Sequence, residues 1–302
     1  MEDSVLKRLT AEPNKKHKVS DFDTSYTAGL KKKEATALLA ENIQYMVDLQ
    51  DMFYAHNRYS LLIVFQAMDA AGKDGTIKHV MSGLNPQGCQ VISFKQPSSE
   101  ELDHDYLWRI YRKLPERGQI GIFNRSHYEE VLVTRVHPEI LLNQQLPRIK
   151  SVKDVNNDFW KERYRQINDF ERHLTDNGTV IIKFFLNVSK EEQKERFIAR
   201  LNDKSKNWKF SLSDIKERQY WDDYMNAFSD MLSNTSTGYA PWYVIPADHK
   251  WFMRYAVGQI ICNKMKSLDL HYPILSAQEK ENIETAKKQL IDTTKDSKNQ
   301  KK

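Results

Sequence analysis

The chain is poor in cysteine and has no long apolar run. Among its 302 residues, Cys89 and Cys262 have neither the number nor the spacing of a disulfide framework or a zinc site. We expect both to be small buried hydrophobes in a reducing compartment. No stretch approaches the ~18 apolar residues of a membrane span, and the start MEDSVLKRL lacks the apolar core of a signal peptide. These absences predict a cytoplasmic protein with no membrane partner.

An excess of charge of one sign is also missing. The chain has 46 Lys and Arg residues against 41 Asp and Glu residues, which leaves a formal net charge of +5. This excess is too small and too evenly mixed to indicate a nucleic-acid coat, so we expect no nucleic-acid partner. Any preference for anions must therefore come from local clusters of basic residues.

Five short apolar runs alternate with segments that are long enough to form helices. Such alternation is typical of an α/β fold with a parallel sheet, and the length suffices for one domain with insertions. The predicted strands cover residues 61–65, 89–94, 119–123, 180–186 and 242–245. Helical spacing of apolar residues predicts an amphipathic helix over about 32–56 that packs on the sheet before the first strand. A second long helix is predicted over 156–177, closed by Gly178.

The segment from Ser60 to Val80, SLLIVFQAMDAAGKDGTIKHV, has the pattern of a phosphate-binding loop, or P-loop. A buried strand leads through small residues to Gly72-Lys73 and then into a helix, whose N-terminus favours anions. Lys73 is expected to reach the bridging and terminal phosphates. The strict G-x-x-x-x-G-K-[ST] pattern fails twice, because Ala67 replaces the first glycine and Asp74 the magnesium-binding Ser or Thr. A plain strand-to-helix turn therefore stays open as the alternative. The predicted phosphate-binding residues of the loop are Ala70, Ala71, Gly72, Asp74, Gly75 and Thr76.

Phosphoryl transfer also needs a metal held by carboxylate and cations around the phosphoryl group. Asp69 is the candidate ligand for Mg²⁺, with Mn²⁺ as the alternative ion, unless it only caps the loop. Arg125 follows the third predicted strand, and residues past the carboxyl ends of parallel strands line the site in such folds. Asn124 stands where a P-loop enzyme usually carries an acidic Walker B residue. An amide cannot neutralise a metal, so more of the charge compensation is expected from Asp69.

Other polar residues are candidates for nucleotide or phosphate contacts. Glu129 either faces a nucleotide or pairs with a cation, whereas Arg135 is the better candidate for nucleotide binding. Residues 196–213 lose apolar periodicity and concentrate positive charge, which predicts a lid between two helices, although a solvated helix face is the alternative. The predicted phosphate ligands outside the P-loop are Lys95, Arg196, Arg200 and Lys206. No histidine has metal-ligand spacing.

The two ends of the chain differ in composition from the part between them. Residues 1–31 are polar and basic and predict an N-terminal arm that lies over the domain or stays mobile. Residues 276–302 are rich in Lys and Glu and predict a charged tail, a frayed helix that ends in disorder at 295–302. The predicted P-loop phosphotransferase domain is residues 32–275.

Four separated blocks of the sequence resemble the second family of polyphosphate kinases. They are AMDAAGKDGTIKH, FNRSHYEEVLVTRVHPE, KNWKFS and TSTGYAPWYVIPADHKW, in that order, and the resemblance spans roughly residues 20–270. It implies a thymidylate-kinase-like P-loop fold of three layers, with a central parallel sheet and a helical lid. It also implies magnesium dependence, reversible transfer of the terminal phosphoryl group of inorganic polyphosphate to adenine or guanine nucleotides, and a homo-oligomer, either a dimer or a tetramer.

The resemblance also assigns roles to individual residues. It places Asp69, Lys73 and Arg125 on the family's catalytic positions and Asn124 on its Walker B position. Lys95, Arg196 and Arg200 fall on basic positions expected near phosphates. The form Asn124 to Glu129, NRSHYE, resembles the subclass that accepts both nucleoside monophosphates and diphosphates, and we expect Asn124, Glu129 and Arg135 to contact the nucleotide.

Two other functions stay open at this point. An ATP-dependent nucleoside monophosphate kinase shares the P-loop, the Asn-Arg pair and the lid, and donor preference separates it from a polyphosphate kinase. A nucleotide- or RNA-binding regulatory protein without turnover is suggested by the mild basicity and the irregular P-loop. Turnover by the purified protein would eliminate it.

Overall fold

The computed structural model describes residues 2–205, 207 and 211–299. The chain forms two compact units, residues 1–270 and residues 271–302, and the first contains every strand that the structure describes. None of the described helices combines the length and the apolar character needed to cross a membrane.

The first unit is built on a six-stranded sheet with the order β1-β6-β5-β2-β4-β3. Neighbours from β6 to β3 are parallel, and the five predicted strands are all present. Every residue of β2 is buried, as expected for a central parallel strand that is covered on both faces. The prediction of an α/β fold with a central parallel sheet is confirmed. The strands are β1 (Thr10–Ala11), β2 (Ser60–Gln66), β3 (Cys89–Ser93), β4 (Ile120–Asn124), β5 (Thr179–Asn187) and β6 (Trp242–Pro246).

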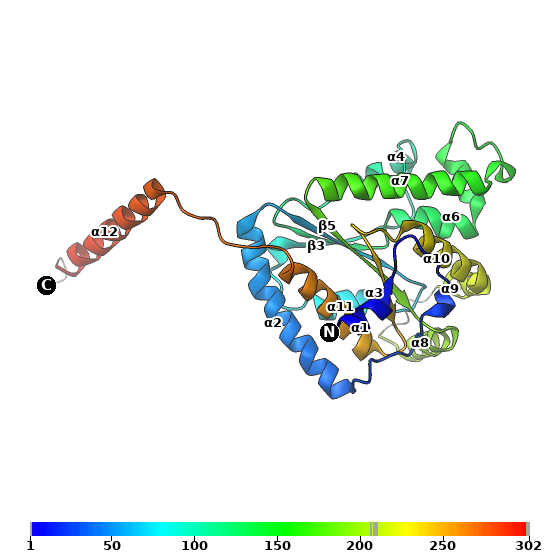
Figure 1. Ribbon diagram of the computed structural model, residues 1–302, viewed down its shortest axis with the longest axis horizontal. Helices are drawn as coiled ribbons and strands as arrows, with labels where there is room; N and C mark the ends of the chain where they lie inside the picture. Colours follow the sequence, from blue (N-terminus) through cyan, green and yellow to red (C-terminus); the bar gives the residue numbers. More distant parts are fainter. Residues whose placement is uncertain (1, 206, 208–210, 300–302) are drawn as a thin grey trace. The chain divides into compact units, whose positions relative to one another are not determined.

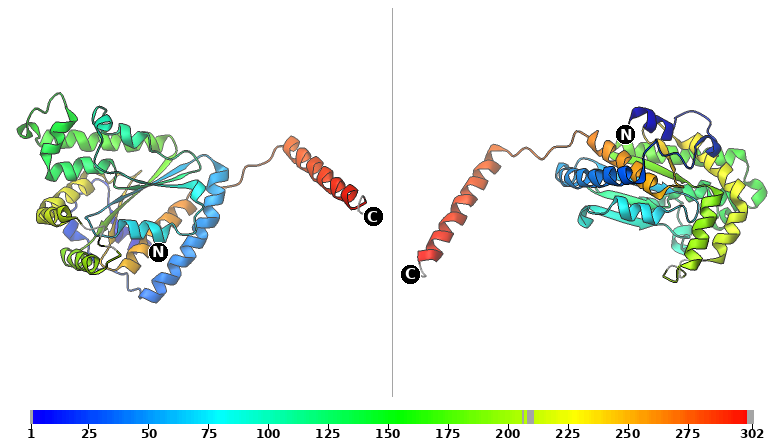
Figure 2. Two further views of the ribbon diagram at one scale, coloured as in Figure 1. Left: turned by 180° about the vertical axis from the view of Figure 1, so that it is seen from behind. Right: turned by 90° about the horizontal axis from the view of Figure 1, so that it is seen from below.

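Helices cover both faces of this sheet and complete the three layers (Figures 1 and 2). One face carries α2, α3 and α11, and the other carries α6, α7 and α10. The α-helices of the first unit are α1 (Asp3–Leu9), α2 (Lys32–His56), α3 (Lys73–Val80), α4 (Ser99–Leu102), α5 (Trp108–Tyr111), α6 (Val133–Val136), α7 (Asn157–Asp176), α8 (Lys190–Asn202), α9 (Leu212–Glu217), α10 (Trp221–Thr235) and α11 (Lys250–Lys266). The 3₁₀ turns are η1 (Val19–Asp21), η2 (Pro86–Gly88), η3 (His127–Val131), η4 (Pro138–Gln144), η5 (Val152–Asp154) and η7 (Arg218–Tyr220).

The two long predicted helices are present with the expected ends. The α2 helix buries Leu39, Met46 and Phe53 at helical spacing, and Asn57 stops it in the left-handed conformation with φ 49°. The α7 helix begins after Asn156, whose side chain accepts hydrogen bonds from the N–H groups of residues 158 and 159. Local capping chemistry therefore sets the boundaries of these helices.

The N-terminal segment is packed against the sheet and α10. The two-residue strand β1 pairs antiparallel with β6, and Leu9 and Ala11 are buried. The backbone N–H groups of His17 and Val19 donate to serine hydroxyls of α10. A two-residue strand is too short to produce a sequence pattern, so β1 was not among the predicted strands.

The second unit contains α12 (Ala277–Asn299). A helix is present, as the composition of this segment predicts, but it continues to Asn299 and so passes the residue at which disorder was predicted to begin. Residues 300–302 lie outside the part of the chain that the structure describes.

Candidate active site

The P-loop connects β2 to α3 and turns through two left-handed residues. Gly72, directly before α3, has φ 108°, and a Cβ atom there would lie 3.2 Å from the side chain of Met253. Ala70 has φ 59°, which is a strained conformation for a residue with a Cβ atom. These two turns bring the loop backbone to the surface of a cleft at the carboxyl ends of the strands.

This cleft has a volume of about 610 Å³ and is formed by the P-loop, the ends of β3 and β4, and two helices of the lid region. It brings together most of the predicted site residues, which come from segments far apart in the sequence. The lining residues are Asp69, Ala70, Gly72, Lys73, Asp74, Gly75, Ser93, Phe94, Lys95, Asn124, Arg125, Arg200 and Asp214.

Arg125 and Lys73 supply positive charge to the cleft. Arg125 has φ 65°, and its guanidinium lies 3.1 Å from the carboxylate of Asp69. The Nζ atom of Lys73 donates to the carbonyl of Ala67 at 2.8 Å. Burial lowers the pKa of Lys73, and the nearby carboxylate of Asp69 opposes this shift. A poorly solvated ammonium gains more from an arriving phosphate than a solvated one.

Asn124 and Asp74 form a direct pair across the cleft. The amide Nδ2 of Asn124 donates to the Oδ1 atom of Asp74 at 2.8 Å. The strict P-loop pattern has a hydroxyl at the start of the helix and a carboxylate at the strand end, so this pair has the acidic and the neutral residue exchanged. The acidic residue at position 74 and the neutral residue at position 124 therefore compensate each other. Asp74 thus places a second carboxylate beside Asp69 in the same cleft, and the expectation that Asp69 carries more of the charge compensation stays a prediction.

A second cavity of about 330 Å³ adjoins the cleft and shares Phe94, Lys95 and Arg125 with it. Glu129 faces this cavity, and burial raises its pKa, although Arg125 and Lys73 oppose that shift. Its wall combines apolar side chains with several polar groups that the sequence analysis did not identify. These are Gln96, Arg109, Glu130, Asn143 and Gln144. Arg109, Asn143 and Gln144 come from α5 and η4, which follow no strand directly, so only their position in space indicates them. Gln96 and Glu130 follow the ends of β3 and β4.

Four predicted ligands lie elsewhere in the structure. Ala71 and Thr76 are fully buried behind the P-loop and do not line the cleft. Arg135 pairs with Asp230 at 3.2 Å and stacks over the ring of Trp160, so it lines neither cavity. The P-loop pattern indicates a stretch of sequence but not which of its side chains face the cleft, and a helical segment indicates a face but not the neighbour that the face meets. The fourth of these predicted ligands, Arg196, also lines neither cavity.

The predicted lid, residues 196–213, is largely helical where the structure describes it. The α8 helix continues to Asn202 and α9 begins at Leu212, so Arg196 and Arg200 both belong to α8. Arg200 faces the cleft and lies 3.6 Å from the carboxylate of Asp214. Arg196 is buried and turned toward the back of the P-loop. Lys206 lies outside the described residues.

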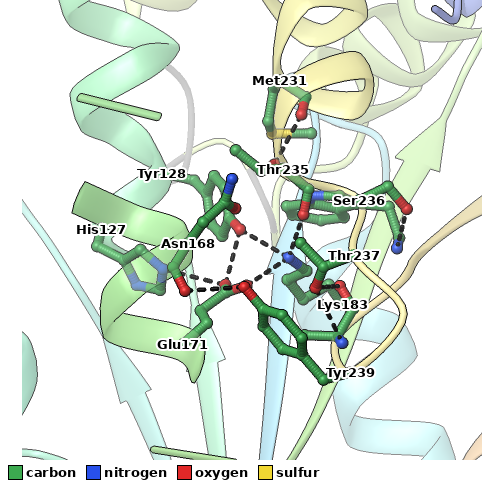
Figure 3. A network of polar contacts seen from close by, with 12 residues as sticks. His127, Tyr128, Asn168, Glu171, Lys183, Met231, Thr235, Ser236, Thr237 and Tyr239 are labelled. Carbon is green, nitrogen blue, oxygen red and sulfur yellow. Dashed lines mark hydrogen bonds and ion pairs between the residues drawn. The ribbon is translucent and has the colours of Figure 1, made fainter. Parts of the chain in front are cut away.

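A buried polar network supports the strand-end side of the cleft (Figure 3). Lys183, in β5, has 0 % of its surface exposed. Its Nζ atom donates to Glu171 at 2.6 Å and, at 2.8 Å, to both the Tyr128 hydroxyl and the Thr235 carbonyl. The Tyr128 hydroxyl in turn donates to Glu171 at 2.7 Å. The network thus connects β5, α7 and α10 to η3, which follows Arg125. A lysine inside the apolar run VIIKFFL is the sequence signal for it.

Comparisons with known proteins agree with this geometry. The chain is 52% identical over 254 residues to an ADP-polyphosphate phosphotransferase of Rhodopseudomonas palustris, covering 84% of this chain and 87% of the relative. It is 42% identical over 270 residues to an AMP/ADP-polyphosphate phosphotransferase of Meiothermus ruber, covering 89% and 96%. The crystal structure of polyphosphate kinase 2 from Arthrobacter aurescens TC1 superposes with a TM-score of 0.79 at 39% identity, covering 91% of this chain and 97% of that one.

The two relatives and the crystal structure each match more than four fifths of the chain. The family model of polyphosphate kinase 2 matches residues 29–272, which is most of the chain. The chain therefore belongs to the polyphosphate kinase 2 family.

Proposed function

We propose that this protein transfers the terminal phosphoryl group of inorganic polyphosphate to nucleoside monophosphates and diphosphates, converting AMP to ADP and ADP to ATP in a reversible reaction. The observation that carries the proposal is the pairing of the two cavities. A cation-lined cleft suited to a phosphate chain opens into a half-apolar cavity that is large enough for a nucleotide base. The names of the two relatives described above support the same donor and the same class of acceptor.

The residues of the cleft have distinct parts in this reaction. Lys73 and Arg125 lie where negative charge spreads over the oxygens of the transferred phosphoryl group, and fixed cations there stabilise the transition state. Asp69 orients Arg125 through their ion pair at 3.1 Å. The backbone N–H groups at the start of α3 add donors for the phosphate oxygens. Lys95 and Arg200 extend the positive track along the polyphosphate chain.

The carboxylates of the cleft fit a magnesium ion that is shared with phosphate. No group of three or more His, Cys, Asp or Glu side chains within the described residues forms a metal cage by itself. Asp69 and Asp74 offer hard oxygen ligands on the same side of the cleft, and Mg²⁺ commonly takes one or two carboxylates together with phosphate oxygens and waters. When bound there, Mg²⁺ or Mn²⁺ would neutralise phosphate charge.

The second cavity is proposed as the acceptor site. Phe94 and the apolar side chains behind it suit the faces of an adenine or guanine ring, and Glu129, Glu130 and Gln144 suit its polar edge. The acceptor phosphates would then extend toward Arg125, which both cavities share. Asn124 itself is neutral, but the carboxylate of Asp74 lies 2.8 Å from its amide, so the proposal that a diphosphate is accepted as well rests on the name of the AMP/ADP-polyphosphate relative.

One experiment tests the proposal and its alternatives together. Purified protein is incubated with Mg²⁺, with either polyphosphate or ATP as the donor and either AMP or ADP as the acceptor, and the nucleotide products are separated. Polyphosphate-dependent formation of ADP from AMP and of ATP from ADP is expected. Turnover with ATP alone would identify a nucleoside monophosphate kinase, and no turnover would leave a binding protein. Acceptance of a single nucleotide would refute the dual-acceptor assignment only.

The proposal includes the assembly and location of the protein. We infer a homo-oligomer, a dimer or a tetramer, which light scattering after gel filtration would measure. A cytoplasmic location fits the two cysteines, neither of which is in a disulfide.

A further inference from the structure

Arg196 has all of its hydrogen-bonding capacity in use inside the protein. A guanidinium has five N–H groups. Nε donates to Glu192 at 2.8 Å, Nη1 donates to the carbonyls of Ala70 and Ala71, and Nη2 donates to the carbonyls of Ala247 and Asp248. Only 8% of the residue is exposed. A phosphate could contact this guanidinium only if one of the five bonds were broken.

The same helix holds the preceding carbonyl of the P-loop. Gln193, which is 1% exposed, donates from Nε2 to the carbonyl of Asp69 at 2.9 Å. Arg218 fixes the other end of that amide by donating to its Oε1 atom. The carbonyl of Gly72 accepts from the hydroxyl of Thr76 at 3.0 Å. Four consecutive P-loop carbonyls, those of residues 69 to 72, are therefore held by donors behind the loop.

This arrangement determines where the loop's N–H groups point. In a trans peptide the C=O bond of one residue and the N–H bond of the next residue point in opposite directions. A carbonyl that is held behind the loop therefore turns the N–H group of the following residue toward the front. Ala71 uses its N–H group on the carbonyl of Met68 at 3.3 Å. The N–H groups of Ala70, Gly72 and Lys73 remain on the cleft side, and these three residues line the cleft. The bonds behind the loop also maintain the strained φ of Ala70.

From this geometry we infer that Arg196 and Gln193 are positioning residues, which aim the P-loop N–H groups at the phosphates from behind and make no phosphate contact themselves. This inference rests on the proposed function for its substrate. It replaces the role of lid phosphate ligand that the sequence predicted for Arg196. Arg200, one turn further along α8, retains that role because it faces the cleft.

The first test compares salt dependence, because each cation that contacts a polyphosphate releases counterions and steepens the fall of affinity with salt. Tripolyphosphate binding is measured by calorimetry across a salt series for Arg196→Met and the matched control Arg200→Met. We expect Arg196→Met to weaken binding about tenfold with an unchanged slope of log K against log salt. Arg200→Met should reduce that slope by roughly one. Equal loss of slope in both variants would overturn the inference.

The second test separates charge from geometry. Lysine keeps the charge of Arg196 but cannot donate to both pairs of carbonyls, so Arg196→Lys should lose turnover like Arg196→Met, by about 100-fold, as for the loss of one transition-state donor. Added guanidinium at millimolar concentration should partly restore Arg196→Ala but not Arg200→Ala. Wild-type turnover in Arg196→Lys would identify a simple charge role and refute positioning.

A third variant covers a failure of the Arg196 variants to fold. Gln193→Met keeps the side-chain volume and removes a single bond to the loop, so we expect about tenfold lower kcat with an unchanged melting temperature. An unchanged kcat would contradict the inference. If the wild type used ATP and not polyphosphate, the proposed function would fail, but the same variants assayed with ATP would still test the positioning role.

Discussion

The two sides of the cleft are supported in different ways. The P-loop is held through its backbone, since Arg196 and Gln193 donate to its carbonyls. The strand-end side is held through side chains, since Lys183 and Glu171 bind the hydroxyl of Tyr128. The reason lies in composition. A loop that must let phosphate approach has small side chains, so another element can hold only its carbonyls, whereas η3 carries large aromatic rings that can be anchored directly.

The comparison also concerns the buried cations themselves. The five N–H groups of Arg196 meet four carbonyls and one carboxylate, and the three N–H groups of Lys183 meet a carboxylate, a hydroxyl and a carbonyl. Both cations are fully bonded, as burial requires. The difference is that the guanidinium spans two segments of backbone, while the ammonium joins the side chains of Glu171 and Tyr128 and one backbone carbonyl, that of Thr235. We therefore expect damage on the P-loop side to affect catalysis first and damage on the strand-end side to affect stability first.

The largest expected effect is on the catalytic groups in front of the P-loop. Lys73→Ala or Asp69→Asn should reduce kcat by about 10³-fold or more, because both groups act on charge that shifts in the transition state. The melting temperature should change little. Steady-state kinetics with polyphosphate and ADP, together with thermal unfolding, measure both quantities. Near wild-type turnover in either variant would refute the assignment of this loop.

On the strand-end side, Lys183→Met should destabilise the protein because it leaves Glu171 buried without its cation. Breaking one member of a buried ion pair costs about 3–5 kcal/mol of the free energy of unfolding. The double variant Lys183→Met/Glu171→Gln should recover much of this loss, since the Gln oxygen can still accept from Tyr128. Urea unfolding measures the stabilities. If the single variant kept full stability but lost turnover, the contrast between the two sides would be wrong.

The exchange of acid and amide between Asp74 and Asn124 predicts coupling between the two positions. Asp74→Ser and Asn124→Asp should each lower kcat/KM by about tenfold, whereas the double variant restores the usual order of groups and should lose less than the sum of the two. A magnesium titration of each variant should show the same coupling in the half-saturating concentration. Additive losses would show that the residues act independently.

The smallest expected effect is a pH dependence of stability. Burial raises the pKa of Glu171, but Lys183 and His127 outweigh this and hold it below its ordinary value of 4.5. Between the pKa of Glu171 in the folded protein and its ordinary value of 4.5, the folded state therefore binds fewer protons than the unfolded state. The contribution of the Glu171 carboxylate to the free energy of unfolding is complete above about pH 4.5. This contribution is lost as the pH falls through the pKa that Glu171 has in the folded protein. Urea midpoints between pH 6 and pH 3 should fall less steeply in the Lys183→Met/Glu171→Gln variant than in wild type.

Local patterns predicted much of this protein. Apolar runs indicated the five main strands, apolar spacing indicated α2, and Gly178 indicated the end of α7. The P-loop pattern indicated Asp69 and Lys73, and the end of the third predicted strand indicated Arg125, and these three residues share one cleft. These features depend on neighbours in the sequence, such as a strand, a turn and the residue past its end. The second cavity was not predicted as a whole, since Arg109, Asn143 and Gln144 come from α5 and η4, which follow no strand directly.

Basic residues show most clearly what the sequence determined and what only the tertiary structure decided. The sequence determined that positive charge concentrates in residues 196–213, because charge is a local property. The loss of apolar periodicity predicted a lid between two helices there, whereas the structure places Arg196 and Arg200 within α8. The sequence could not distinguish Arg200, which faces the cleft, from Arg196, which holds the loop from behind. The two residues are four positions apart on one helix. Their different roles arise because the P-loop and the turn after β6 lie close enough to Arg196 to use all of its donors.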